Sequence, residues 1–222
     1  MIINNSISII ESLNSSNLIF WDFDGVIKDS VGVKTTAFKK IFSQYDQRIV
    51  NTIRQHHEAN GGVSRFDKIP LYLKWAGEEV TEELVAKFCN LFSENVMQSV
   101  IDSPWVPGVK EWLLDNFQKK QFILVTATPQ HEIEKILLAL NINQCFQGVF
   151  GSPIIKKEAI RLVLEKENIS PYKALMIGDS ETDLLAANDN AVNFLLRRTN
   201  LNLALQASYK GLQFEYLNYE QN

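Results

Sequence analysis

The 222-residue chain has little of what marks several large protein classes. Its two cysteines, Cys89 and Cys145, lie far apart and outside any CxxC pattern, so neither a disulfide framework nor a zinc site is expected. A formal net charge of −4, without any block of lysine or arginine, argues against a nucleic-acid partner. No apolar run approaches the length of a membrane span, and the N-terminus lacks the basic region and cleavage motif of a signal peptide. We therefore expect a cytoplasmic protein with no membrane partner.

What the chain does have is an ordinary globular composition, 45% hydrophobic and 22% charged, with enough length for one core and a smaller second unit. Residues 18–21 are four bulky apolar residues, a run typical of a buried strand in a parallel sheet. Asp22 and Asp24 follow two positions apart, so in extended backbone both carboxyl groups project to one side. Two like charges so close require a proton or a cation between them, and Mg²⁺ suits such a site.

The stretch DFDGVIKDS, residues 22–30, resembles the first signature of the haloacid dehalogenase superfamily. The similar branch is the Mg²⁺-dependent one, with phosphoglycolate phosphatases and β-phosphoglucomutase-like enzymes. The resemblance implies that Asp22 attacks phosphorus to form an aspartyl-phosphate, and that Asp24 protonates the leaving oxygen and later deprotonates water. True dehalogenases of the family lack the second acid, so Asp24 favours phosphoryl chemistry. The alternative is an acidic strand end that is only a solvated turn.

The segment between Ser30 and Pro107 contains no run typical of a buried strand. Its apolar residues recur at spacings of three and four, which predicts helices over 37–42, 67–77 and 81–100. A mostly helical insertion after the first strand is similar to the family's α-helical cap, which closes over the phosphate site. The predicted fold class is α/β, a Rossmann-like three-layer core with a parallel sheet (1–30 and 104–222) and an inserted helical cap (31–103).

Two features of the cap are candidates for contact with substrate. The GGVSR segment at 61–65 resembles the specificity loop of β-phosphoglucomutase-like members, in which the arginine faces the active site. Arg65 is therefore a predicted substrate ligand for a second anionic or hydroxyl-rich group, and the alternative is an exposed loop with a solvated arginine. His56 and His57 are adjacent rather than four apart, so we interpret them as surface histidines and not as a metal pair.

The second predicted strand, 122–128, ends in hydroxyl residues. Thr128 is a natural N-cap and Pro129 a natural first helical residue, which places Thr126 beside a helix N-terminus. This pattern resembles the family's second motif, and the resemblance implies that Thr126 and the backbone N–H of Ala127 bind the transferring phosphoryl group. A threonine at a strand end is, alternatively, only a cap.

The last two motifs follow a predicted strand at 145–150. A GSPxxK pattern places the family's motif lysine on Lys156, with Lys157 as the fallback, although the common KPxP form is missing; both are otherwise solvated charges. The sequence GDSETD at 178–183 resembles the fourth motif, which implies that Asp179 is a Mg²⁺ ligand together with Asp22 and Asp24. Asp183 would support them and also cap the following helix.

The predicted function is a Mg²⁺-dependent phosphatase that hydrolyses a small phosphorylated metabolite, either a phosphosugar or a phosphoglycolate-like acid. One alternative is a phosphomutase of the β-phosphoglucomutase type. Such mutases usually carry a histidine about where Lys34 stands, and the lysine here counts against the mutase interpretation. The other alternative is a catalytically silent binding module. The sequence leaves open whether the protein is a monomer or a homodimer.

Overall fold

The computed structural model describes residues 2–217, with side chains described from Ile9 onward. Six strands form one parallel sheet in the order β3-β2-β1-β4-β5-β6. The strands are β1 (Leu18–Trp21), β2 (Gln121–Pro129), β3 (Gly148–Ser152), β4 (Ala174–Gly178), β5 (Asn193–Arg197) and β6 (Gln213–Phe214). Because β1 pairs with β2 on one side and β4 on the other, its carboxyl end lies between the carboxyl ends of two neighbouring strands.

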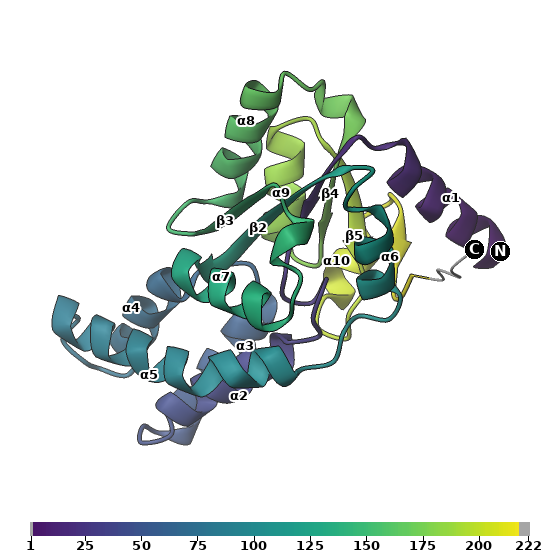
Figure 1. Ribbon diagram of the computed structural model, residues 1–222. Helices are drawn as coiled ribbons and strands as arrows, with labels where there is room; N and C mark the ends of the chain where they lie inside the picture. The colour runs from purple at the N-terminus through teal and green to yellow at the C-terminus, as the bar shows by residue number, and fades with distance from the viewer. Residues whose placement is uncertain (1, 218–222) are drawn as a thin grey trace.

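The two faces of the sheet are buried separately, as the alternation along β1 requires. Ile19 and Trp21 pack into the apolar cluster that includes α1 (Ile2–Ser15), α6 (Val109–Asn116) and α7 (Gln130–Ala139). Leu18 and Phe20 point to the opposite face, which is covered by α8 (Lys156–Glu167) and α9 (Glu181–Asp189). Figure 1 shows these helices on the two sides of the sheet, so the predicted three-layer α/β fold is confirmed. A short α10 (Leu203–Ser208) lies between β5 and β6 in the chain.

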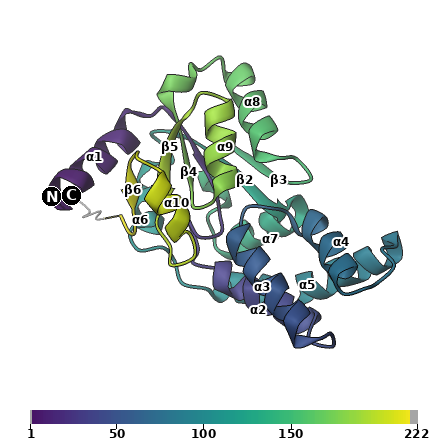
Figure 2. The same ribbon diagram turned by 180° about the vertical axis from the view of Figure 1, so that it is seen from behind.

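Four consecutive helices are inserted between β1 and β2: α2 (Val31–Ile41), α3 (Gln47–Ala59), α4 (Arg65–Trp75) and α5 (Glu82–Asp102). They lie together at one end of the molecule in both views (Figure 1, Figure 2). The expected helical insertion is thus present, and Thr81 caps α5 by accepting from the N–H of Leu84. The exact limits of the two units stay a prediction. The apolar cluster on the α7 side of the sheet continues without a break into this helical cap.

Three details differ from the expectations. Helix α3 was not predicted, because its few apolar residues are outnumbered by polar ones; Asp46, which accepts from the N–H of Arg48, is the cap that marks its start. The third strand starts at Gly148 because Asn143–Cys145 form a 3₁₀ turn. Thr128 is not an N-cap: β2 continues to Pro129, and the Thr128 hydroxyl bonds Asp24 instead.

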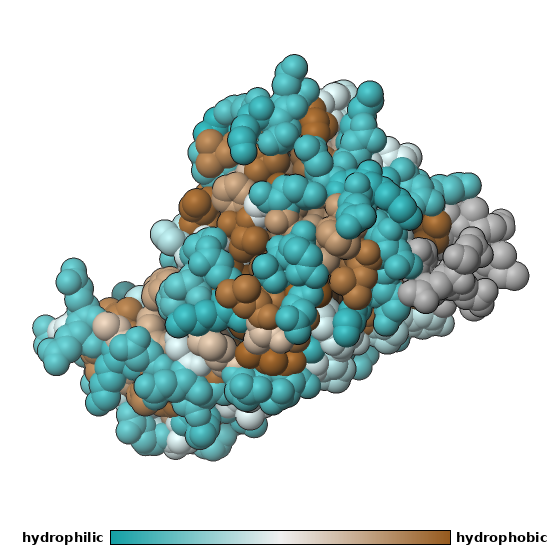
Figure 3. Space-filling model, in the orientation of Figure 1, coloured by the Kyte–Doolittle hydropathy of each residue, from teal (hydrophilic) through white to brown (hydrophobic). Residues whose placement is uncertain are grey.

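Hydrophilic side chains cover most of the face seen in Figure 3, with hydrophobic ones showing between them near the middle of the molecule. No helix in the described part of the chain is both long and apolar enough to cross a membrane. Both cysteines are buried free thiols.

Candidate active site

The first signature begins directly after β1, where that strand ends between β2 and β4. Asp22 is 3% exposed, and its Oδ1 accepts a 2.8 Å hydrogen bond from the backbone N–H of Phe23. Gly25 turns the chain with a φ of +78°, and a Cβ at this position would lie 2.1 Å from Oδ2 of Asp179. Glycine is therefore required here both for the turn and for the approach of the fourth motif.

Three buried carboxylates meet where β1 and β4 end side by side. One oxygen from each of Asp22, Asp179 and Asp183 lies within 4.8 Å of the others, and we call these residues the acidic cluster. Burial is the largest cause that raises the pKa of Asp22 to about 7; Lys156 opposes it, and repulsion from Asp183 and Asp24 adds to it. Burial and Asp22 likewise raise the pKa of Asp179 well above its ordinary value. When ionised, the carboxylates of the acidic cluster carry more negative charge than their surroundings balance. Such oxygen ligands fit a hard divalent cation such as Mg²⁺.

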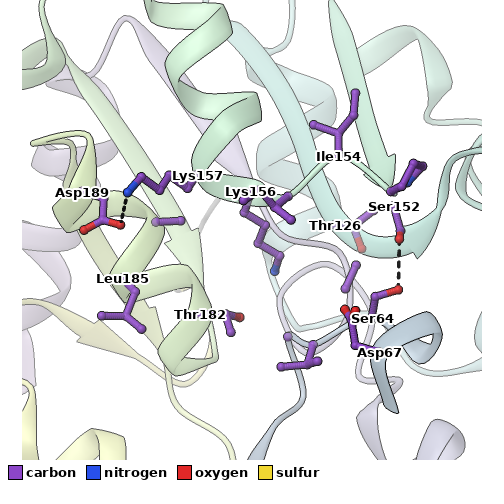
Figure 4. A pocket seen from close by; sticks show the side chains of 16 residues that line it. Ser64, Asp67, Thr126, Ser152, Ile154, Lys156, Lys157, Thr182, Leu185 and Asp189 are labelled. Carbon is purple, nitrogen blue, oxygen red and sulfur yellow. Dashed lines mark hydrogen bonds and ion pairs between the residues drawn. The ribbon is translucent and has the colours of Figure 1, made fainter. Parts of the chain in front are cut away.

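Lys156 is the cation within this cluster. As the first residue of α8 it is 8% exposed, and its Nζ lies 3.0 Å from Oδ1 of Asp22 and 2.5 Å from Oδ1 of Asp183. The two carboxylates raise its pKa above the ordinary value although burial opposes this. Lys157 points away and pairs with Asp189 at 2.9 Å, as Figure 4 shows. Of the two candidate lysines, the structure brings Lys156, and not Lys157, into contact with Asp22.

Asp183 supports the cluster rather than offering free oxygens. Its Oδ2 accepts from the N–H and the hydroxyl of Ser180 at 3.0 and 2.6 Å, while Oδ1 accepts from Lys156. The bond from the Ser180 N–H is one half of the capping box of α9 that the sequence predicts; in the other half the Ser180 hydroxyl accepts from the N–H of Asp183. Asp22 and Asp179 are thus the members of the cluster with carboxylate oxygens left for a metal ion.

Asp24 lies in a different environment from Asp22. Its carboxylate accepts from the hydroxyls of Ser30 at 2.6 Å and Thr128 at 3.1 Å, and it pairs with Lys34. Lys34 also donates to the Thr128 hydroxyl at 2.9 Å. Burial favours the protonated acid, but Lys34 and the hydroxyls prevail and hold the pKa of Asp24 below its ordinary value. With its oxygens engaged in this way, a metal role for Asp24 stays a prediction.

Lys34, Ser30 and Thr128 were not predicted as site residues. Lys34 stands where the related mutases carry a histidine, and that position was the one signal in the sequence. Ser30 is the last residue of the first signature. Thr128 follows Thr126 by two positions in an extended strand, so the side chains of these two threonines project to the same side of the strand. The bond from Lys34 on α2 to Thr128 on β2 depends on how these two elements pack, which the sequence does not show.

Thr126 and Ala127 lie at the carboxyl end of β2, as predicted. Thr126 is 1% exposed, and its hydroxyl accepts a 3.2 Å bond from the backbone N–H of Thr128. Both residues line a cavity of about 280 Å³ that they share with Lys156. Figure 4 shows Lys156 and Thr126 directed toward this space from opposite walls.

The cap loop closes one side of the same cavity. A Cβ on Gly62 would lie 1.9 Å from Oγ1 of Thr182 and 2.4 Å from Oγ of Ser180, so only glycine permits this contact. The hydroxyls of Ser64 in the cap and Ser152 in the core are 3.0 Å apart (Figure 4). The cap therefore rests on the core directly beside the predicted phosphate site.

Arg65 also reaches the core, but toward a protein partner. Its two guanidinium NH groups lie 3.1 and 2.5 Å from the carboxylate oxygens of Glu132 on α7, and one of them is 2.6 Å from the hydroxyl of Ser93. The guanidinium also stacks 4.6 Å from the ring centre of Phe92. Arg65 is buried rather than solvated, and its role as a substrate ligand stays a prediction, with Glu132 as a competing partner for its fork.

The interpretation of both histidines as surface residues is wrong for His57. It is 2% exposed, packs 4.7 Å from the ring of Phe38, and its Nδ1 is 3.0 Å from Nζ of Lys68. His56 is half-buried, and its Nδ1 is 3.0 Å from the hydroxyl of Tyr72. The apolar spacing of Val50, Ile53 and His57 along α3 is the signal that places His57 on the inner face.

Comparison with known proteins gives one family and several distant relatives. The family described as haloacid dehalogenase-like hydrolase matches residues 17–190. Phosphoglycolate phosphatase 1 of Pseudomonas aeruginosa is 25% identical over 77% of this chain, which spans 65% of that protein's length. A phosphorylated carbohydrates phosphatase of Thermotoga maritima is 26% identical over 78% of this chain and 81% of its own. The structure of β-phosphoglucomutase from Clostridium difficile shares the fold, with a TM-score of 0.70 at 20% identity over 91% of this chain and 92% of its own.

Proposed function

Because the chain belongs to the haloacid dehalogenase-like hydrolases, we propose that it is a Mg²⁺-dependent phosphatase that hydrolyses a small phosphorylated metabolite. One observation carries this proposal. The buried carboxylate of Asp22 is held between Lys156 and Asp179 at the carboxyl end of the central strand, beside a cavity lined by Thr126 and Ala127. A carboxylate so placed is suited to attack a phosphorus atom, and the two relatives described above are phosphatases.

In the proposed first step, a carboxylate oxygen of Asp22 forms a bond to phosphorus while the ester P–O bond breaks. Asp24 gives its proton to the leaving alkoxide, so the alcohol departs neutral. A Mg²⁺ ion bound at Asp22 and Asp179 would supply positive charge that offsets the repulsion between carboxylate and phosphate. Lys156 contributes a second positive charge, and the hydroxyl of Thr126 with the N–H of Ala127 orients the phosphoryl oxygens.

In the second step, water attacks the aspartyl-phosphate and Asp24 takes its proton, which regenerates Asp22 and releases inorganic phosphate. The contacts from Lys34, Ser30 and Thr128 stabilise the ionised form of Asp24, the form that this step requires. Protonation of Asp24 for the first step weakens its ion pair with Lys34. Since Lys34 belongs to cap helix α2, the protonation state of Asp24 and the seating of the cap are linked.

The test is phosphate release by the purified protein from p-nitrophenyl phosphate, with Mg²⁺ and with excess EDTA. We expect turnover that requires Mg²⁺, and a phosphoryl group on the tryptic peptide that contains Asp22 after rapid acid quenching. Full activity in EDTA would overturn the metal dependence. A protein that releases no phosphate from any member of a broad phosphomonoester panel would be a silent binding module.

A phosphomutase is the second candidate, favoured by the cap loop that closes the cavity at Gly62 and Ser64. Such closure excludes water, which lets an aspartyl-phosphate survive long enough for re-transfer. Lys34 in place of the usual histidine counts against it. Conversion of a sugar 1-phosphate to the 6-phosphate, dependent on a sugar bisphosphate, would assign the mutase; release of phosphate without isomerisation would assign the phosphatase.

A further inference from the structure

Lys68 is a buried amine without an acidic partner. It lies on the inner face of cap helix α4, is 1% exposed, and its Nζ is 3.0 Å from Nδ1 of His57. Within the part of the chain whose side chains are described, no carboxylate lies within 4.0 Å of it. An ammonium buried with an imidazole as partner is costly, so its position requires another explanation than internal stability.

The amine faces a small cavity of about 20 Å³ between cap and core. We call the nitrogen-bearing side chains that line it, Lys34, His57, Arg65 and Lys68, the basic cluster. Two of them are neutralised, because Lys34 pairs with Asp24 and Arg65 with Glu132. Nε2 of His57 is also buried with no hydrogen-bond partner among the described residues. The side chains that line the cavity therefore include one amine, that of Lys68, whose positive charge no carboxylate balances.

The cavity also touches the predicted phosphate site. Ala127 and Thr128 form its core-side wall, and Ala127 and Val63 line both this cavity and the larger one. A group attached to a phosphate bound at Thr126 and Ala127 would reach this space through a short chain. Room for about one water-sized group suits a carboxylate head in place of a water, and not a second phosphate.

We propose that Lys68, with His57 behind it and Lys34 beside it, forms a subsite for a carboxylate on the substrate. This inference rests on the proposed phosphatase function and narrows its substrate class to short phosphomonoesters that carry a carboxylic acid. Arg65 is the less suitable ligand because its fork is engaged by Glu132, whereas Lys68 has donors free for an anion.

The charges around Lys68 agree with this role. Burial, together with Lys34 on α2, lowers its pKa to about 7, although Asp24 after β1 and Asp67 on α4 oppose this. His57 on α3 is itself held neutral, since burial and Lys68 lower its pKa. From α5 the cavity is lined by the apolar Phe92. An incoming carboxylate would supply the negative charge that these elements lack.

The test compares 2-phosphoglycolate with 2-hydroxyethyl phosphate, which replaces the carboxylate by a neutral hydroxymethyl group. We expect kcat/KM of the parent to favour 2-phosphoglycolate, and Lys68→Met to lower that preference by about 10- to 100-fold, since a charge-assisted contact is lost. Lys74→Met, an exposed lysine of the same helix, is the matched control and should leave the preference unchanged. Lys68→Gln provides a second variant in case methionine disturbs the packing.

Binding supplies a readout independent of turnover. In the Asp22→Asn background, 2-phosphoglycolate should raise the melting temperature more than 2-hydroxyethyl phosphate, and Lys68→Met should remove that difference. If Lys68→Met changes the rise in melting temperature equally for both compounds, or for neither, the carboxylate subsite is overturned. Hydrolysis of p-nitrophenyl phosphate by the parent would in that case still support the phosphatase function. If the parent hydrolyses none of the compounds, the proposed function is overturned instead. The melting data alone would then decide whether Lys68 binds a carboxylate.

Discussion

The acidic cluster of the core and the basic cluster between cap and core are opposite in charge. The acidic cluster, Asp22, Asp179 and Asp183, gathers three carboxylates around one lysine, and burial raises the pKa of two of them. The basic cluster, Lys34, Arg65, Lys68 and His57, includes a lysine whose pKa burial lowers. Each cluster is costly by itself, for opposite reasons. A metal ion on one side and a doubly anionic substrate between them would relieve both.

The change with the largest expected effect is Asp22→Asn in the acidic cluster. An amide cannot attack phosphorus, so turnover should fall by on the order of 10⁴-fold or more. The pKa of Asp22 is raised from 3.8 to about 7, so the cost of burying its carboxylate grows as pH rises above 3.8 and is complete above pH 7. The variant should therefore melt no earlier than the parent at pH 8 in EDTA. Asp102→Asn, an exposed aspartate, is the control; comparable turnover in Asp22→Asn would remove the nucleophile assignment.

Asp24→Asn should cost on the order of 10²–10⁴-fold in kcat through loss of acid–base help. Because Lys34 is then left without its carboxylate partner, the cap should also seat less firmly. With a good leaving group such as p-nitrophenolate, the aspartyl-phosphate should still form and should persist longer than in the parent. Rapid-quench mass spectrometry checks this. A variant as active as the parent, or one that an activated phosphoryl donor never labels, contradicts the role.

Arg65→Ala tests whether the basic cluster reads substrate or holds the cap. Because it leaves the buried carboxylate of Glu132 unpaired, unfolding free energy should fall by about 3–5 kcal/mol. Adding Glu132→Gln should restore much of that loss in a denaturant titration. If Arg65 also binds substrate, the double variant should keep a raised KM for the physiological substrate with normal kinetics on aryl phosphates. Normal KM for both would assign Arg65 to cap seating alone.

Lys68→Met should have the smallest effect, and it should be stabilising. The pKa of Lys68 is about 7 in the folded protein against 10.5 for a free lysine, so its ammonium destabilises the fold below pH 7, and this penalty fades as pH rises toward 10.5. At pH 6 the variant should gain about 1–4 kcal/mol, and at pH 10 little. Melting curves at the two pH values check the sign. A gain that does not depend on pH would mean that packing, not charge, is responsible.

Much of the acidic cluster could be predicted from sequence because parallel strands place their carboxyl ends at one edge. That Asp22, Thr126 and Asp179 each lie at the end of a strand follows from the apolar runs before them, and their grouping at one site was implied by the resemblance to the family's motifs. The choice of Lys156 over Lys157 could not be settled in this way, since adjacent helical residues point in different directions and only the packing of α8 decides between them.

The basic cluster was largely beyond sequence reasoning. The partners of Lys34, Arg65 and Lys68 come from segments distant in the chain or from an unpredicted helix, so no local pattern pairs them. His57 was misplaced because the helix that carries it was not predicted, so the spacing of Val50, Ile53 and His57 that marks its inner face was not used. Spacing fixes which residues share a face, and cap packing fixes what that face meets.

One apolar cluster runs from the sheet into the cap, joining Trp21 and Trp112 in the core to Phe38, Tyr72 and Phe92 in the cap. A cap with an independent interior could melt or exchange its amides alone. Here the helices share side-chain contacts with the sheet face, so α2 and α5 should exchange their backbone amide hydrogens together with β1 rather than long before it. Cap and core should then form one cooperative unit, and heat should unfold both in a single transition.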